Sequence, residues 1–102
     1  MRQKMQYAFK SRALRNIWIF YRNVAQKYRH VYDSNDMERN IRQAVLDAYR
    51  IEQSLLRRPP LLERWQQKGW YMANAGKWYY AYTINDDTII IEDACHEQNM
   101  HE

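Results

Sequence analysis

Residues 69–102 read GWYMANAGKWYYAYTINDDTIIIEDACHEQNMHE, and this stretch decides the fold of the chain. It holds two turn signals, Asn-Ala-Gly at residues 74–76 and Asn-Asp-Asp at residues 85–87. Glycine readily adopts the positive φ that tight hairpins need, and Asn and Asp favour turns through local hydrogen bonds. The segments around these turns are rich in aromatic and β-branched residues, which favour strands. We therefore expect three antiparallel strands, at residues 70–74, 77–84 and 88–95.

The middle strand has two different faces, because side chains alternate along a strand. One face carries Trp78, Tyr80, Tyr82 and Ile84, and the other carries Lys77, Tyr79, Ala81 and Thr83. The sequence leaves open which face the rest of the protein covers. Three consecutive isoleucines in the last strand indicate a central strand that is buried on both faces.

Two segments with helical periodicity come before these strands, and a short strand at residues 5–9 comes before the helices. Ser11 is placed to cap the first helix. The apolar face of that helix shows three-to-four spacing, at Leu14, Ile17, Trp18, Tyr21, Val24, Ala25 and Tyr28. Ile19 and Phe20 widen this face, either for further core packing or for contact with a partner.

The second helix begins with the spacing of a capping box at Asn35 and Glu38. Its apolar face follows the same periodicity, with one imperfection at Glu52: Met37, Ile41, Ala44, Val45, Ala48, Ile51, Glu52 and Leu55. The helix should end near Arg58, because each proline of the pair that follows disfavours helical backbone in the residue before it.

One further turn, containing Leu61, Leu62 and Trp65, is expected to cover the sheet. The predicted fold is therefore α+β with the order β-α-α-β-β-β. A helical hairpin packs on a small antiparallel sheet, in one domain that covers residues 1–102.

Length and composition limit the class of protein. The chain has 102 residues, enough for one modest core, and no apolar run long enough to span a membrane. The first residues are charged and have no apolar stretch of the kind found in signal peptides. A single cysteine, Cys95, excludes an internal disulfide and fits a reducing compartment. We expect a cytoplasmic protein.

Charge is divided unevenly along the chain, whose net charge is +4. Residues 1–30 carry basic side chains and no acidic one, whereas residues 69–102 carry a single basic side chain, Lys77, among several acidic ones. Clustered positive charge attracts polyanions, either nucleic acid or an acidic protein. The alternative is an ordinary solvated helix surface.

His96 lies where the last strand ends, and a histidine there could transfer protons near neutral pH. The alternative is a surface histidine near the end of the chain. His96 and His101 are five residues apart, which is the wrong spacing for a shared helical metal site, so we expect no metal. Cys95 points to the opposite face and is expected to be buried. No glycine-rich phosphate loop occurs, which excludes cofactors held by such loops, and we expect no cofactor.

Two further groups of residues can each be interpreted in two ways. Glu92 and Asp93 interrupt an apolar strand, where one of them acts as a general base or pairs with a basic helix residue. The cations Arg64, Lys68 and Lys77, together with Tyr79, could form a basic and aromatic surface for single-stranded RNA. The alternative is that Tyr79 packs under the helices.

The chain resembles the RelE/ParE superfamily of bacterial toxins along nearly its whole length. Residues 11–14 (Ser-Arg-Ala-Leu) are similar to the entry into the first helix of that family. Residues 77–99 are similar to its pattern of a basic or aromatic pair, an aliphatic-x-Tyr element, an acidic turn, an apolar strand and a polar end. Tyr82 falls on the recurrent tyrosine, and Asp86 and Asp87 fall on the turn.

This resemblance implies the toxin of a type II toxin–antitoxin system, bound and blocked by a cognate antitoxin. Many members cut mRNA on the ribosome without a metal, by positioning the 2′-hydroxyl for attack on the adjacent phosphate. Tyr79 stands where those members have an arginine, and Lys77 is the nearest replacement for its charge. The catalytic set implied for this chain is His96, Lys77, Tyr79 and Tyr82, and the RNA-binding set is Arg12, Arg64, Lys68, Gln98 and Asn99.

Two alternatives stay open. One is a non-catalytic member of the same fold, which either poisons DNA gyrase, as the ParE branch does, or only pairs with an antitoxin. The acidic end of the chain and the missing arginine favour this alternative. The other is an unrelated basic adaptor that binds an acidic protein.

Overall fold

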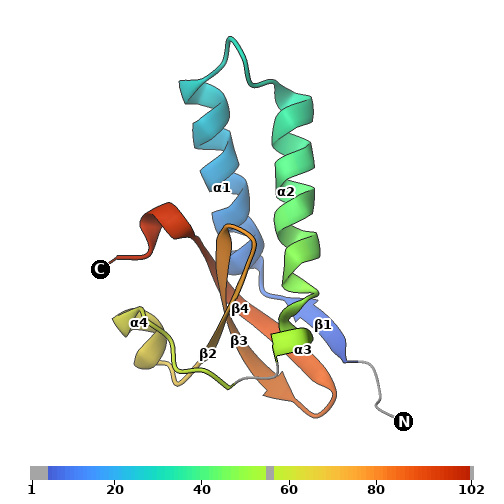
Figure 1. Cartoon of the computed structure of the whole chain (residues 1–102), viewed down its shortest axis with the longest axis vertical. Coiled ribbons are helices and arrows are strands. Elements are labelled where there is room, and N and C mark those ends of the chain that lie inside the picture. Colours follow the sequence, from blue (N-terminus) through green and yellow to red (C-terminus); the bar gives the residue numbers. More distant parts are fainter. Residues whose placement is uncertain (1–4, 55–56, 102) are drawn as a thin grey trace.

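The computed structural model describes residues 5–54 and 57–101, which form helices packed on a four-stranded mixed sheet. The fold is α+β, as the sequence predicts. The elements follow in the order β1 Gln6–Phe9, α1 Ser11–Lys27, α2 Ser34–Ala48, α3 Ile51–Ser54, α4 Glu63–Gln66, β2 Tyr71–Ala75, β3 Trp78–Asn85, β4 Thr88–His96 and the 3₁₀ turn η1 Glu97–Asn99 (Figure 1).

The sheet has the strand order β1-β4-β3-β2, so β4 is central. The pairs β2–β3 and β3–β4 are antiparallel, and the three predicted strands lie within one residue of their expected bounds. β1 pairs with β4 in parallel, with Gln6 opposite Thr88. The prediction of a wholly antiparallel sheet is therefore wrong at this edge, because local sequence signals do not reveal on which side a distant strand inserts.

The helical hairpin of α1 and α2 stands over one face of the sheet (Figure 1). Beneath it, small helix residues such as Ala13 and Ala44 share one core with large strand residues. The face of the middle strand that the hairpin covers is therefore the one that carries Trp78, Tyr80 and Tyr82. The buried members of this core are Ala13, Ile17, Ala44, Ala48, Ile51, Ala73, Ala75, Trp78, Tyr80, Tyr82, Ile89, Ile91 and Ala94.

A second, smaller cluster contains Tyr79. Leu62 and Trp65, from the segment around α4, pack with Met72, Ala81 and Cys95, and Tyr79 is half-buried against them. The predicted turn therefore does cover the sheet, although Leu61 is exposed. Tyr79 packs neither under the hairpin nor as a free surface ring.

The buried face of α1 differs from the predicted one. Ala13 and Ile17 are fully buried, whereas Leu14 and Trp18 are 41% and 45% exposed and Tyr28 is also exposed. The small side chain of Ala13 lets the helix approach the sheet closely, and this rotates the larger residues outward. The predicted face is therefore right at Ile17 and Tyr21, which lie in or against the core, and wrong at Leu14, Trp18 and Tyr28.

Both predicted helix caps are also misplaced. Ser11 is the first residue of α1, and Lys10 takes the cap position without a side-chain hydrogen bond. α2 begins with a capping box formed by Asp33 and Asp36, in which each carboxylate accepts the other residue's backbone N–H. This box lies two residues before the predicted one.

The end of the second helical segment is interrupted. α2 ends at Ala48 and α3 at Ser54, and residues 57–60 are not helical, while the predicted core position Leu55 lies outside the described residues. Glu52, the imperfect position in the pattern, accepts the backbone N–H of Met5 at 3.1 Å. Among the described residues, no helix has the length and hydropathy needed to cross a membrane.

Candidate functional site

A groove of about 670 Å³ runs between the helical hairpin, the β2–β3 turn and η1. Its volume is in the range of sites that hold small ligands or single nucleotides. Aromatic, amide and charged side chains share its lining: Phe20, Tyr21, Asn23, Lys27, Tyr28, Asn40, Gln43, Asp47, Lys77, Trp78, His96, Glu97, Gln98 and Asn99. The groove therefore offers stacking surfaces and hydrogen-bonding groups together.

His96 is the last residue of β4 and is only 5% exposed. Its ring stacks on Phe20 with centroids 4.0 Å apart and meets the edge of Trp78 at 5.3 Å. Trp78 is directly opposite His96 in the β3–β4 pair. Two aromatic rings from α1 and β3 therefore fix the imidazole, and it is not a free surface histidine.

The hydrogen bonding of His96 defines its tautomer. Nδ1 accepts the backbone N–H of Gln98 at 3.2 Å, which leaves the proton of the neutral ring on Nε2. Within residues 5–54 and 57–101, every side-chain nitrogen or oxygen that is shielded from solvent has a hydrogen-bond partner. Nε2 has none among these residues, so it belongs to the small part of the ring that solvent reaches. His96 therefore presents an N–H donor.

The protonation of His96 follows from its surroundings. Burial lowers the pKa of His96, and the positive charge of Lys77 lowers it further, while the Glu97 carboxylate raises it. The net shift is downward, so the folded protein holds a neutral imidazole near pH 7. The proton donor at Nε2 is therefore the ordinary state of the site.

This shift predicts acid sensitivity. In the unfolded chain His96 takes up a proton below about pH 6.5, whereas in the folded chain it does so only at lower pH. The free energy of unfolding should therefore fall as the pH drops from about 6.5 through the folded-state pKa, and this contribution should be fully present above that window. Urea unfolding at a series of pH values is expected to show a steeper acid loss for wild type than for His96→Asn. Parallel profiles would contradict the assignment.

Lys77 and Glu97 lie beside each other at the same end of the groove. The carbonyl of Lys77 accepts the backbone N–H of Glu97 at 2.9 Å, which ties η1 to the β2–β3 turn. Both residues are exposed and both line the groove. The turn and the polar end of β4 thus bring a cation, a carboxylate and the His96 donor to one place.

Asp47, from α2, supplies a buried carboxylate to the groove. Its Oδ1 accepts a hydrogen bond from Gln43 at 2.9 Å and lies 3.7 Å from the Arg50 guanidinium. Its Oδ2 faces Gly76, where an added Cβ would lie 2.5 Å away. Sequence reasoning missed Asp47, although its position three residues after the buried Ala44 places it beside the apolar face of α2.

Gly76 combines a positive φ of 63° with this close approach. Gly76→Ala is expected to lower the free energy of unfolding by about 2–4 kcal/mol, from the strained backbone and the clash together. Gly69→Ala is a matched control, because Gly69 has a similar φ of 71° but no heavy atom within 4 Å of the added Cβ. It should lose only about 1 kcal/mol. Equal losses in urea unfolding would show that Asp47 does not restrict this position.

The other predicted catalytic residues lie elsewhere. Tyr82 is buried in the main core, where its ring is 5.7 Å from that of Tyr71 and burial raises the pKa of its hydroxyl. Tyr79 packs in the second cluster and does not line the groove. The structure therefore brings together Lys77 and His96 from the predicted catalytic set, and separates Tyr79 and Tyr82 from them.

The predicted RNA-binding residues divide in the same way. Gln98 and Asn99 line the groove. Arg64 stacks over Trp65 and points a guanidinium nitrogen at Cys95 Sγ, 3.8 Å away, and Lys68 is exposed just after α4. Neither Arg64 nor Lys68 lines the groove.

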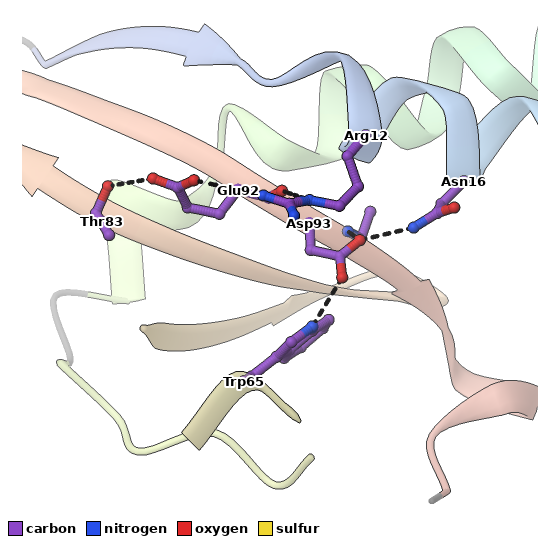
Figure 2. A network of polar contacts seen from close by, with 7 residues as sticks. Arg12, Asn16, Trp65, Thr83, Glu92 and Asp93 are labelled. Carbon is purple, nitrogen blue, oxygen red and sulfur yellow. Dashed lines mark hydrogen bonds and ion pairs between the residues drawn. The ribbon is translucent and has the colours of Figure 1, made fainter. Parts of the chain in front are cut away.

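Arg12, the remaining predicted RNA ligand, is engaged with Glu92 (Figure 2). Its Nε donates to the Glu92 carbonyl at 3.1 Å, its guanidinium lies 3.9 Å from the Glu92 carboxylate, and it stacks 5.1 Å from the Trp70 ring. The Glu92 carboxylate also accepts from Thr83 at 2.9 Å. The reading of Glu92 as a partner for a basic helix residue is therefore confirmed.

Asp93 pairs with neutral donors instead (Figure 2). Its carboxylate accepts from Asn16 at 2.7 Å, from Trp65 Nε1 at 2.9 Å and from the backbone of Ala94 at 2.8 Å. Because Asn16 is on α1 and Trp65 on α4, this one buried side chain connects β4 to elements on both sides of the sheet. Its contacts are those of a structural residue.

Comparison with protein-family models and with curated proteins found no match to this chain. Among the described residues, no group of three or more His, Cys, Asp or Glu side chains could hold a metal ion.

Proposed function

We propose that this chain is the toxin of a bacterial type II toxin–antitoxin system and has a RelE/ParE-like fold. In this proposal it is a metal-independent endoribonuclease that cuts mRNA on the ribosome, arrests growth and is neutralised by a cognate antitoxin. The observation that carries the proposal is the meeting of Lys77 and His96 at one end of the groove.

The order of elements supports the proposal. A leading strand, a helical hairpin and three antiparallel strands are what the resemblance implies, and the chain has this order. The charge of α1 also supports it, because the helix carries four cations and no acidic residue: Arg12, Arg15, Arg22 and Lys27. Lys27 lines the groove, where a phosphodiester backbone would meet it.

In the proposed reaction, the hydrogen-bond donors and cations of the groove act on the phosphate of the RNA. In this step the 2′-oxygen bonds to the adjacent phosphorus and the bond from phosphorus to the 5′-oxygen breaks, which leaves a 2′,3′-cyclic phosphate and a 5′-hydroxyl. Water takes up the proton of the 2′-hydroxyl and supplies the proton of the new 5′-hydroxyl. Lys77 stabilises the negative charge that develops on the phosphate oxygens, and the Nε2–H of His96 donates to one of them. His96 is a poor base in this geometry, because its free lone pair, on Nδ1, is used by the Gln98 N–H. The exposed ring of Tyr28 offers a surface for stacking a base.

A second candidate is a non-catalytic member of the same fold, which acts on gyrase or only pairs with an antitoxin. Two observations favour it. Tyr79 and Tyr82 lie outside the groove, and Nδ1 of His96 is not free to accept a proton. In this case the groove binds a partner without reacting.

Controlled expression in a bacterial host, followed by mapping of mRNA 5′ ends on isolated ribosomes, tests the two candidates. The endoribonuclease should stop growth and produce new 5′ ends that depend on Lys77. Growth arrest with intact mRNA and broken DNA would indicate the gyrase poison. Absence of toxicity would indicate a chain that only pairs with an antitoxin.

A further inference from the structure

The α2 wall of the groove presents two acceptor oxygens that no other described residue uses. Asp47 is 8% exposed, and its Oδ1 accepts from Gln43 Nε2 at 2.9 Å and lies 3.7 Å from the Arg50 guanidinium. Its Oδ2 has no hydrogen-bond donor within residues 5–54 and 57–101, and since every shielded oxygen there has a partner, solvent reaches Oδ2. Because Gln43 turns its amide nitrogen towards Asp47, its Oε1 is the atom left for the groove.

Gly76 keeps the Asp47 carboxylate accessible. A Cβ at residue 76 would lie 2.5 Å from Asp47 Oδ2 and 3.3 Å from its Cγ. Any other side chain in this turn would therefore cover the oxygen. With glycine there, a ligand in the groove can approach Oδ2 directly.

A hydrogen-bond donor lies on the α1 wall of the same groove. The hydroxyl oxygen of Tyr21 accepts Trp78 Nε1–H at 3.0 Å, and its own proton has no acceptor among the described residues. Burial raises the pKa of this hydroxyl, the hydrogen bond from Trp78 lowers it, and the nearby Tyr32 and Asp47 raise it, with a net rise. The Tyr21 hydroxyl is therefore protonated near neutral pH and available to donate.

We infer that this part of the groove binds a guanine base. The Watson–Crick edge of guanine carries two donors, the N2 amine and N1–H, followed by one acceptor, O6. Gln43 Oε1 accepts from the N2 amine, Asp47 Oδ2 accepts from N1–H, and the Tyr21 O–H donates to O6. The ligand is a guanosine nucleotide, either free or within an RNA chain.

The order acceptor, acceptor, donor selects against other occupants. Adenine offers one donor beside one acceptor, cytosine offers one donor and two acceptors, and uracil offers a donor between two acceptors. Each of them leaves one of the two groove oxygens without a donor, and a desolvated acceptor without a partner is costly. The guanidinium of an arginine side chain would serve both oxygens but would give the Tyr21 O–H no acceptor.

Cations for the attached phosphate lie in the same groove. Lys77 directly follows Gly76, and Lys27 projects from α1. Neither lysine has an ion pair in the part of the chain that the structure describes. The Asp47 carboxylate repels a phosphate and attracts N–H donors, so a nucleotide binds with its base towards Asp47 and its phosphate towards a lysine.

The inference names the base of the RNA that is assigned to this groove, and to that extent it rests on the proposed function. Binding of a nucleotide, however, requires no reaction. Base preference and RNA cleavage can therefore be measured separately, and each can fail without the other.

Isothermal titration calorimetry of the full chain with 5′-nucleotides tests the base. GMP should bind with a Kd of about 0.1 mM, and AMP, CMP and UMP should bind about tenfold more weakly or worse. IMP, which differs from GMP only by lacking the N2 amine, should also bind about tenfold more weakly. The 2′-O-methyl trinucleotides UGU and UAU cannot be cleaved through the 2′-oxygen. Tighter binding of UGU than of GMP would identify RNA as the source of the guanine, and weaker binding would identify the free nucleotide.

Two variants assign the contacts. Gln43→Leu, at an exposed position, should bring the Kd values of GMP and IMP to a ratio of about one. Asp47→Asn keeps an acceptor for Gln43 and should weaken GMP binding by about tenfold or more, with circular dichroism to verify folding. Gln53→Leu and Glu38→Gln are matched controls at exposed positions outside the groove, and they should leave every Kd unchanged.

Four results would overturn the inference: equal binding of GMP and AMP, a preference for GMP over IMP that Gln43→Leu does not change, tighter binding of N-acetylarginine amide than of GMP, or no nucleotide binding up to about 5 mM. Selective GMP binding by a chain that cuts no RNA would support the inference and contradict the endoribonuclease. Cleavage of RNA without any preference for guanine nucleotides in binding would contradict the inference alone.

Discussion

Asp93→Ala is expected to lower the free energy of unfolding by about 3–5 kcal/mol, the largest effect of any single change considered for this protein. Asp93 is 7% exposed, and its carboxylate accepts hydrogen bonds from Asn16, Trp65 and the Ala94 backbone. Alanine leaves the Trp65 Nε1–H without an acceptor in a site where that ring is fully buried. The cost of such an orphaned donor is added to the lost hydrogen bonds.

Urea unfolding followed by Trp fluorescence measures this loss. Because domains of this size are stable by only about 5–15 kcal/mol, Asp93→Ala can unfold under ordinary conditions. Asp93→Asn keeps one acceptor oxygen and should lose about half as much. Glu92→Ala is the matched control, because its partner Arg12 is half exposed, and it should lose only about 1 kcal/mol.

A double-mutant cycle identifies the contact responsible. Trp65→Phe removes the buried donor, so Asp93→Ala should be less destabilising in that background by about 1–2 kcal/mol. A cycle with no coupling would show that Trp65 does not depend on the carboxylate. If Asp93 served as a general base instead, Asp93→Asn would abolish RNA cleavage while leaving stability almost intact.

Lys77→Ala is expected to reduce RNA cleavage by about 10²-fold or more, if the proposed endoribonuclease function holds. Lys77 lies at the end of the groove where His96 presents its N–H, and its charge acts on the imidazole. Lys77→Arg should keep most of the activity, because it keeps the charge. Arg58→Ala, an exposed cation outside the groove, should leave cleavage unchanged. Single-turnover cleavage of a short RNA by purified protein, or on ribosomes, gives the rates.

Two substitutions of His96 separate its roles. The amide of asparagine reaches about the position of Nδ1 and can accept the Gln98 N–H, whereas the amide of glutamine reaches the position of Nε2 and can donate to the groove. If His96 acts as a neutral donor, His96→Gln should keep more cleavage than His96→Asn. Equal loss of all activity in both variants, with unchanged folding, would instead indicate proton transfer by the imidazole.

The strands and their turns were predictable because their signals are local. The Asn-Ala-Gly and Asn-Asp-Asp turns fix the hairpins, and alternation along 77–84 correctly separated the Trp78 face from the Tyr79 face. The parallel pairing of β1 with β4 could not be predicted, since it depends on where a distant strand inserts. The buried side of α1 was predicted only in part: Ile17 is fully buried as expected, but Ala13, a small residue that the pattern did not select, is buried in place of Leu14 and Trp18.

The candidate site was predictable only in part. His96 was predicted from its position at the end of the last strand, and Lys77 as the nearest replacement for the arginine of the family pattern. The rest of the site depends on how α1 and α2 stand over the sheet. This arrangement brings His96 and Lys77 to one groove, adds the buried carboxylate of Asp47 and stacks His96 on Phe20. Tyr82 was assigned to catalysis through a family pattern, but its environment is that of a core residue.

The position of β4 between β1 and β3 has a consequence for synthesis. During translation β1, the helical hairpin and both earlier strands leave the ribosome before β4, and until then β1 has no neighbour to pair with. The sheet, and with it the imidazole against Phe20, can therefore assemble only after most of the polypeptide has emerged. If the proposed function holds, a nascent chain would thus be unable to act on the ribosome that is making it.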